Sequence, residues 1–177
     1  MNINVLSCVL LGFCCGFSHA ACNDKILSSA PNNRYLVLGD GSEIKDVETG
    51  LIWQRCSIGQ SWNGTSCIGE AKTYGRFAAL KIAYELGNGY RLPNIKELQS
   101  LVEEACYSPS INTTAFPNVP KRVFTWVDSK PIHSFYISSS PYSGSTWWHV
   151  DFYQGGVHVV SDGNYYVRAV RTSVLGK

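Results

Sequence analysis

The spacing of apolar residues changes at Cys106 and divides the chain into a mixed first part and a second part rich in β-structure. In the first part, short apolar runs at 35–38, 44–46 and 51–53 alternate with glycine-containing turns, which predicts three short strands. After Cys106 the apolar residues recur with period two, and turn residues follow one another closely. The pattern therefore predicts an α+β domain whose second half is mostly sheet.

Two segments of the first part have helical spacing. The first, from Thr73 to Leu86, carries an apolar side made of Phe77, Leu80, Ala83 and Tyr84, and Gly87 is placed to end it. The second begins after Pro93, where Asn94 is a natural N-cap and Glu97 completes a capping box. Its apolar stripe consists of Ile95, Leu98, Leu101, Val102 and Ala105, which predicts a structural helix packed on the core.

The strand pattern of the second part is clearest from Trp147 to Tyr153. We expect one face to be buried and one displayed, with Trp148, Val150 and Phe152 inside and Trp147, His149, Asp151 and Tyr153 outside. Hairpin turns at Gly155-Gly156 and Asp162-Gly163 lead into strands at 157–160 and 165–171, which completes a three-stranded C-terminal meander. Further strands are expected at 123–127 and 135–138, followed by a loop over 139–145.

The N-terminal segment has the features of a secretory signal peptide. Val5 to Phe17 is an uncharged, mostly apolar run, and Ser18-His19-Ala20 is a small-x-small cleavage pattern. The run is shorter than the roughly 20 residues that span a bilayer, so a retained anchor is the weaker alternative. We therefore expect residues 1–20 to be removed and residues 21–177 to form a single exported domain. It would be periplasmic, at the cell surface or secreted, with no membrane span in the mature form.

Cysteine usage agrees with export. Once the signal is removed, the chain keeps an even set of four cysteines, Cys22, Cys56, Cys67 and Cys106, which indicates two disulfides. Three connectivities are open. We favour Cys56 with Cys67, closing a short loop, and Cys22 with Cys106, tying the N-terminal arm to the end of the second helix. A lipid on Cys22 is the alternative, although His19 stands where lipoproteins usually have Leu.

The composition is that of a globular protein, with 45% hydrophobic and only 16% charged residues. The formal net charge of +2 is too small to indicate nucleic-acid binding. Charge is nevertheless uneven, because residues 107–177 carry six bases and three acids, a local excess of +3. Of these bases, Lys121, Arg122 and Lys130 bracket one predicted strand, whereas Arg168 and Arg171 lie in a strand where structural ion pairs are expected.

Five sequence blocks in fixed order carry a family resemblance. They are Thr49 to Cys56, Arg91 to Leu98, Ser138 to Tyr142, Trp148 to Phe152 and Val167 to Arg171. In this order they resemble the C-terminal domain family of the Legionella collagen-like adhesin. The Arg-Leu-Pro helix start and the closing Val-Arg-x-Val-Arg strand are also similar to the formylglycine-generating-enzyme branch of the C-type-lectin-like fold. The resemblance implies two helices flanking a twisted, mainly antiparallel sheet.

For function, the resemblance implies an exported adhesin that binds sulfated polysaccharide, such as host glycosaminoglycan. The resemblance leaves a homo-oligomer as one possible state of the protein. The chain has no Gly-X-Y region that would enforce a collagen-like trimer. The formylglycine-generating branch works through paired cysteines in its C-terminal half, and here no cysteine follows Cys106. We therefore do not expect that activity.

Other catalytic and metal-binding patterns are weak. There is no Gly-x-Ser-x-Gly elbow, and Ser140, His149 and Asp151 are grouped only by their proximity in sequence. His149 and Asp151 are better explained, with His158, as an exposed polar face than as metal ligands. Asp162-Gly163-Asn164 is better explained as a tight turn than as a calcium site. We expect no enzyme activity, no cofactor and no metal.

The expected ligand-binding surface lies on the β-rich half and comprises Lys121, Arg122, Lys130, Trp147 and His149. The three cations suit sulfate, and Trp147 is out of phase with the core and free to stack on a sugar ring. By contrast, Trp53, Trp126 and Trp148 lie in apolar strand patterns and are expected in the core. The leading hypothesis is a non-enzymatic, adhesin-like domain for sulfated polysaccharide or another surface ligand. The competing hypothesis is a structural or assembly subunit of a surface appendage that binds a protein partner.

Overall fold

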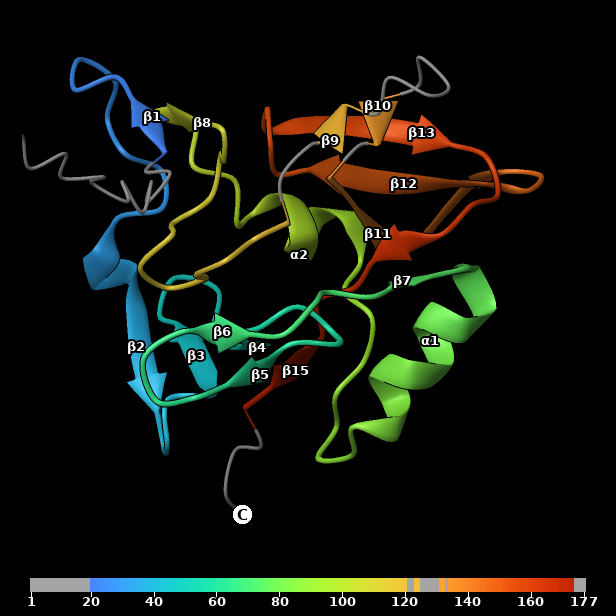
Figure 1. Ribbon diagram of the computed structural model, residues 1–177, viewed down its shortest axis with the longest axis horizontal. Helices are drawn as coiled ribbons and strands as arrows, with labels where there is room; N and C mark the ends of the chain where they lie inside the picture. Colours follow the sequence, from blue (N-terminus) through green and yellow to red (C-terminus); the bar gives the residue numbers. More distant parts are fainter. Residues whose placement is uncertain (1–19, 121–122, 125–130, 133, 174–177) are drawn as a thin grey trace, which may run out of the picture.

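The computed structural model describes residues 20–120, 123–124, 131–132 and 134–173. Within these residues it has two α-helices, α1 (Arg76–Glu85) and α2 (Ile95–Gln99), a single 3-10 turn at Asn32–Arg34, and mostly antiparallel strands (Figure 1). The mixed α+β class is confirmed. The described strands form a five-stranded sheet, a four-stranded sheet and three two-stranded ribbons, where one sheet was expected. The expected signal peptide lies outside the described residues except for Ala20.

The four-stranded sheet joins the N-terminal strands to the end of the domain. Its order is β15-β4-β3-β2, with bounds Val170–Thr172, Leu51–Gln54, Glu43–Asp46 and Tyr35–Leu38. The three N-terminal strands are those that the sequence predicts. The fourth, β15, pairs antiparallel with β4 and sets Val170 opposite Trp53. The last block of the sequence therefore completes the first sheet.

The five-stranded sheet has the order β13-β12-β11-β14-β7, with bounds Gly156–Val160, Thr146–Asp151, Phe135–Ser143, Tyr165–Tyr166 and Thr73–Tyr74. Its meander is β11-β12-β13, so the prediction that 165–171 forms the third meander strand was wrong. After β13 the chain crosses the sheet, and β14 pairs in parallel with β11. The predicted loop over 139–145 is mostly strand as well, because the hairpin turn lies at Gly144, whose φ of 55° suits glycine.

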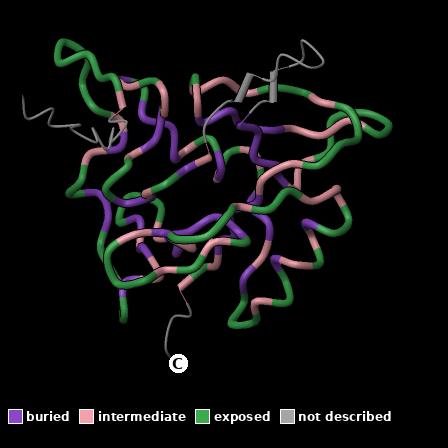
Figure 2. Tube along the Cα trace, in the orientation of Figure 1, coloured by how far each residue is buried: buried purple, intermediate pink, exposed green. Residues whose placement is uncertain are grey.

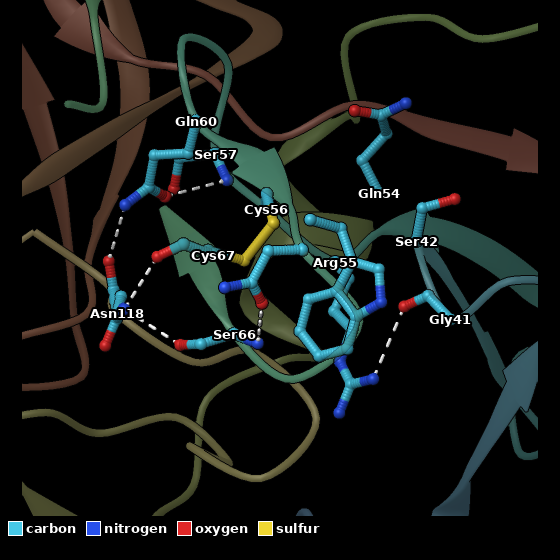
Figure 3. Close-up of a disulfide and its surroundings, with 12 residues drawn as sticks. Gly41, Ser42, Gln54, Arg55, Cys56, Ser57, Gln60, Ser66, Cys67 and Asn118 are labelled. Atoms are coloured by element: carbon cyan, nitrogen blue, oxygen red, sulfur yellow. Dashed lines mark hydrogen bonds between the residues drawn. A yellow bond between two sulfur atoms is a disulfide. The ribbon is translucent and has the colours of Figure 1, made fainter. Parts of the chain in front are cut away.

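The three ribbons are β1 (Ala21–Cys22) with β8 (Cys106–Tyr107), β5 (Ser61–Trp62) with β6 (Cys67–Ile68), and β9 (Val123–Phe124) with β10 (Pro131–Ile132). Disulfides join Cys22 to Cys106 and Cys56 to Cys67, so the favoured pairing is confirmed. Around the second bridge, the Asn118 amide donates to the Cys67 carbonyl oxygen at 2.6 Å and to Ser66 Oγ at 2.9 Å (Figure 3). This disulfide loop is therefore fastened to the segment that precedes β9.

Both helices are shorter than predicted. Thr73 and Tyr74 belong to an edge strand, since Gly75 has an extended backbone and α1 begins only at Arg76. The predicted apolar side of α1 was also wrong, because Phe77 and Tyr84 are 71% and 77% exposed while Ala79 and Ala83 are buried. In α2 the predicted capping box between Asn94 and Glu97 is present. The helix ends at Gln99, yet its stripe continues as buried residues in the following turn, Leu101, Val102 and Ala105.

The five-stranded sheet is buried on both faces at β11 and β12. Neighbouring residues Tyr136 and Ile137 of β11 point to opposite faces, and both are buried. Tyr136 belongs to a core shared with α2 and the four-stranded sheet, and Ile137 to a second core shared with α1. Figure 2 shows the buried positions concentrated where these elements meet. A strand covered on both faces cannot display an alternating polar side.

Candidate ligand-binding site

The structure describes two of the five predicted ligand-binding residues, Trp147 and His149 on β12. Lys121, Arg122 and Lys130 lie outside the described residues, as does Trp126. In the sequence Lys121 and Arg122 precede β9 and Lys130 precedes β10, and the part of these cations in a binding surface stays a prediction.

The prediction that β12 displays His149 and Asp151 was wrong. Both are 1% exposed, because α1 and its neighbours cover the sheet face opposite Val150. His149 sits between Ile137 of β11 and His158 of β13 in the antiparallel register. Of the predicted core tryptophans, Trp53 is fully buried, but Trp148 is only half-buried and stands edge-on to the exposed Tyr142 at 5.1 Å between ring centres. His149 is therefore an interior residue.

A small cavity lies beside His149, which we call the inner cavity. It is lined by Arg76 at the start of α1, by Trp147 and His149, by Tyr165, and by the turn at 160–163. The space open to the centre of a water molecule is about 10 Å³, enough for about one water. The inner cavity is thus too small for a whole ligand but large enough for one small functional group.

An open depression, which we call the outer hollow, adjoins the inner cavity. It is formed by Gly75 to Ala78 at the start of α1 and by Asp162, Gly163 and Asn164, and its volume is about 520 Å³. Arg76, Asp162 and Gly163 line both spaces. The volume lies within the range of small-molecule sites. Figure 1 shows where α1 begins, next to β7 at the edge of the sheet.

Arg76 lines both spaces, and its guanidinium contacts an aromatic ring from each of them. Its guanidinium carbon is 4.5 Å from the centre of the Phe77 ring and 5.1 Å from that of Trp147. Such cation–π contacts hold a guanidinium in place while leaving its N–H groups free to donate. The exposed Phe77 and the half-buried Trp147 therefore flank a positive charge at the surface.

The interior side of the site is neutral. Burial lowers the pKa of His149 to about 4, so the ring is uncharged at neutral pH. Its Nδ1 is 2.8 Å from the Trp147 carbonyl oxygen, and its ring centre is 4.1 Å from that of Tyr165. Burial, with the Asp162 carboxylate second, raises the pKa of Tyr165, whose hydroxyl donates to the Ser161 carbonyl oxygen at 2.7 Å.

Sequence reasoning missed Arg76 and Phe77. The spacing placed Phe77 in the core, and nothing in the sequence pattern distinguished Arg76 from the other residues of the predicted helix. The available signal was Gly75, which breaks the helix just before an Arg-Phe pair. The expected ion pair of Arg171 is present, with Glu43 at 2.7 Å. Arg168 is buried and donates instead to the backbone carbonyls of Gln54 and Arg55.

Each of the three residues weighed as a catalytic group has a backbone group as its hydrogen-bond partner. Ser140 Oγ accepts from the Ile95 backbone N–H, the His149 Nδ1 faces the Trp147 carbonyl, and the Asp151 carboxylate accepts from the Tyr153 backbone N–H. Within the described ranges, no three His, Cys, Asp or Glu side chains gather as metal ligands would. Nor does the described part of the chain contain a helix long and apolar enough to cross a membrane.

The fold and the site define a class: a disulfide-bonded α+β domain of the extracytoplasmic kind, with an arginine and aromatic rings beside an open hollow. The family model of the Lcl C-terminal domain matches residues 42–171. The chain belongs to this family, which confirms the resemblance seen in the five sequence blocks. Among curated proteins and among solved structures, none matches the chain significantly.

Proposed function

We propose that this chain is an exported, non-enzymatic, adhesin-like binding domain that recognises sulfated polysaccharide at the outer hollow. The observation that carries the proposal is the position of Arg76, held against the rings of Phe77 and Trp147 at the edge of a hollow large enough for a sugar residue. Family membership supports it. On this proposal the domain works outside the cytoplasm, in the periplasm, at the cell surface or after secretion.

The chemistry of the hollow suits a sulfated sugar in two ways. A guanidinium donates paired, charge-assisted hydrogen bonds to the oxygens of a sulfate group. Exposed aromatic rings such as Phe77 offer an apolar face on which the C–H side of a sugar ring can rest. Lys121, Arg122 and Lys130 stay predicted contacts for a longer polysaccharide chain. The proposal needs no metal, cofactor or reacting group.

We propose in addition that the fold is C-type-lectin-like. Two helices contact the five-stranded sheet, and the last strand, β15, pairs with an early one, β4. These features support the assignment implied by the Arg-Leu-Pro and Val-Arg-x-Val-Arg blocks.

A second candidate function rests on a different surface. Strand β2 is an edge of the four-stranded sheet, and its Leu36 and Val37 are 52% and 57% exposed. An apolar edge strand with free backbone groups can accept a strand from a partner chain. This feature favours the alternative function as an assembly subunit of a surface appendage.

A glycan array separates the two candidates. The purified mature domain would be applied to an array that includes heparin and chondroitin sulfates, at a low and a high salt concentration. Retention on sulfated glycans that falls with salt supports the polysaccharide site, because exposed charges are screened. A blank array together with a protein that co-purifies through β2, and is lost when Val37 is changed to Lys, would reject the polysaccharide site in favour of assembly.

A further inference from the structure

Three buried polar atoms without a hydrogen-bond partner belong to residues of the inner cavity. They are Arg76 Nε, Trp147 Nε1 and His149 Nε2, and within the described part of the chain no group hydrogen-bonds to any of them. An unpaired polar group in a protein interior is destabilising, so three of them in residues around one cavity indicate that the cavity holds an occupant. The inner cavity is therefore a candidate site for one small polar group.

The hydrogens on these atoms fix what the group must be. Arg76 Nε and Trp147 Nε1 each carry a hydrogen and only donate. The Trp147 carbonyl oxygen, 2.8 Å from His149 Nδ1, only accepts, so the ring proton of the neutral imidazole sits on Nδ1. His149 Nε2 is consequently bare and only accepts. Two donors and one acceptor without a partner thus belong to residues that line the cavity.

A hydroxyl group matches this arrangement. Its oxygen accepts two hydrogen bonds, and its hydrogen donates one. A sulfate or carboxylate oxygen satisfies the two donors, but it has no hydrogen to donate to Nε2. Its lone pair would face the lone pair of Nε2 and repel it. An ammonium group has hydrogens for Nε2 but cannot accept from Arg76 or Trp147. The geometry therefore selects a hydroxyl oxygen over either ion.

We infer that the inner cavity is a hydroxyl-binding subsite. A water molecule occupies it in the free domain, and one sugar hydroxyl occupies it in the complex. The inference deepens the proposed function and rests on it. Arg76 lines both spaces, so its outward N–H groups can bind a sulfate in the outer hollow while its Nε binds the hydroxyl. The subsite would make the domain select sugar rings that carry a sulfate and a free hydroxyl at a fixed separation.

The first test is a high-resolution crystal structure of the free domain and of its complex with a heparin tetrasaccharide. We expect one water within hydrogen-bond distance of Arg76 Nε, Trp147 Nε1 and His149 Nε2 in the free domain, replaced by a sugar hydroxyl oxygen in the complex. A dry cavity, a chloride or sulfate in the cavity, or a water that stays in place when the tetrasaccharide binds would overturn the inference.

The second test uses variants that keep ring shape. Trp147→Phe removes one donor and His149→Phe removes the acceptor, and each should weaken tetrasaccharide binding about two- to tenfold, the worth of one hydrogen bond. Lys81→Gln on the exposed side of α1 is the control and should leave binding unchanged. Trp147→Phe keeps the test valid if His149→Phe fails to fold. Equal affinity of the folded variants and wild type overturns the subsite alone. Absence of tetrasaccharide binding by wild type overturns the proposed function as well.

Discussion

The burial of His149 predicts that the domain loses stability as the pH falls below that of free histidine. The folded-state pKa is lowered from 6.5 to about 4 by burial, so protons bind the unfolded chain more readily between these values. The stability contributed by the neutral ring is fully present above about pH 6.5 and is lost as the pH falls towards 4. A shift of this size corresponds to about 3 kcal/mol, at about 1.4 kcal/mol per pH unit.

Other titrating groups act in a lower range. The carboxylates of Asp46 and Glu103 have pKa values below their ordinary 3.8 and 4.5, held down by hydrogen bonds from Arg34 and Ser28 against the cost of burial. Their stabilising effect is lost only as the pH falls through and below those ordinary values. The window from about pH 6.5 to about pH 5 therefore reports mainly on histidine.

Urea unfolding measured from about pH 7 to about pH 5 tests this reasoning. Wild type should lose stability steadily across the window, and His149→Gln should show a much flatter dependence even if it is less stable throughout. His158→Gln is the matched control, because His158 is the exposed partner of His149 across the hairpin. The reasoning is refuted if the His149 variant keeps the wild-type slope, or if NMR titration finds His149 protonating near pH 6.5.

Three further predictions follow from burial, loop length and charge. Trp53→Ala, at a fully buried core position, should lower the free energy of unfolding by about 3–5 kcal/mol, and the half-buried Trp148→Ala by clearly less, as urea titration would show. Replacing Cys22 and Cys106 by Ser should cost about 2 kcal/mol more than replacing Cys56 and Cys67, since the bridges are separated by 84 and 11 residues and the longer loop loses more entropy; equal losses in calorimetry would contradict this. Changing Lys121, Arg122 and Lys130 together to Ser should weaken retention on sulfated glycans with little change in thermal midpoint, and unaltered retention would remove these residues from the site.

The sequence predicted those parts of the fold that depend on local chemistry. The capping box at Asn94 and Glu97 is set by residues three apart, and the three N-terminal strands are bounded by their own turns. The disulfide pairing also followed from the sequence, because one bridge closes a short loop and leaves a single partner for Cys22. These features need no knowledge of the packed structure.

The parts that were predicted wrongly depend on which elements meet in space. Alternation along β12 shows that its two faces differ, but it does not show that Tyr165 and the Arg76 end of α1 pack on the second face, where His149 is buried. The turn at Asp162-Gly163 favours a hairpin locally, yet the chain crosses the sheet and pairs Tyr166 with Tyr136 in parallel. The same packing exposes Phe77, which helical spacing had placed in the core, and turns it into part of the candidate site.

The central claim, that Arg76 and its aromatic neighbours bind sulfated polysaccharide, is tested most directly by heparin affinity of Arg76→Gln beside Lys81→Gln. Both changes remove one positive charge from α1, but of the two residues it is Arg76 that lines the outer hollow and lies against the rings of Phe77 and Trp147. Wild type and Lys81→Gln should bind heparin within about twofold of each other, whereas Arg76→Gln should bind at least about tenfold more weakly, the loss expected for a hydrogen bond to a charged group. Equal weakening of the two variants, or unchanged binding of Arg76→Gln, would contradict the account.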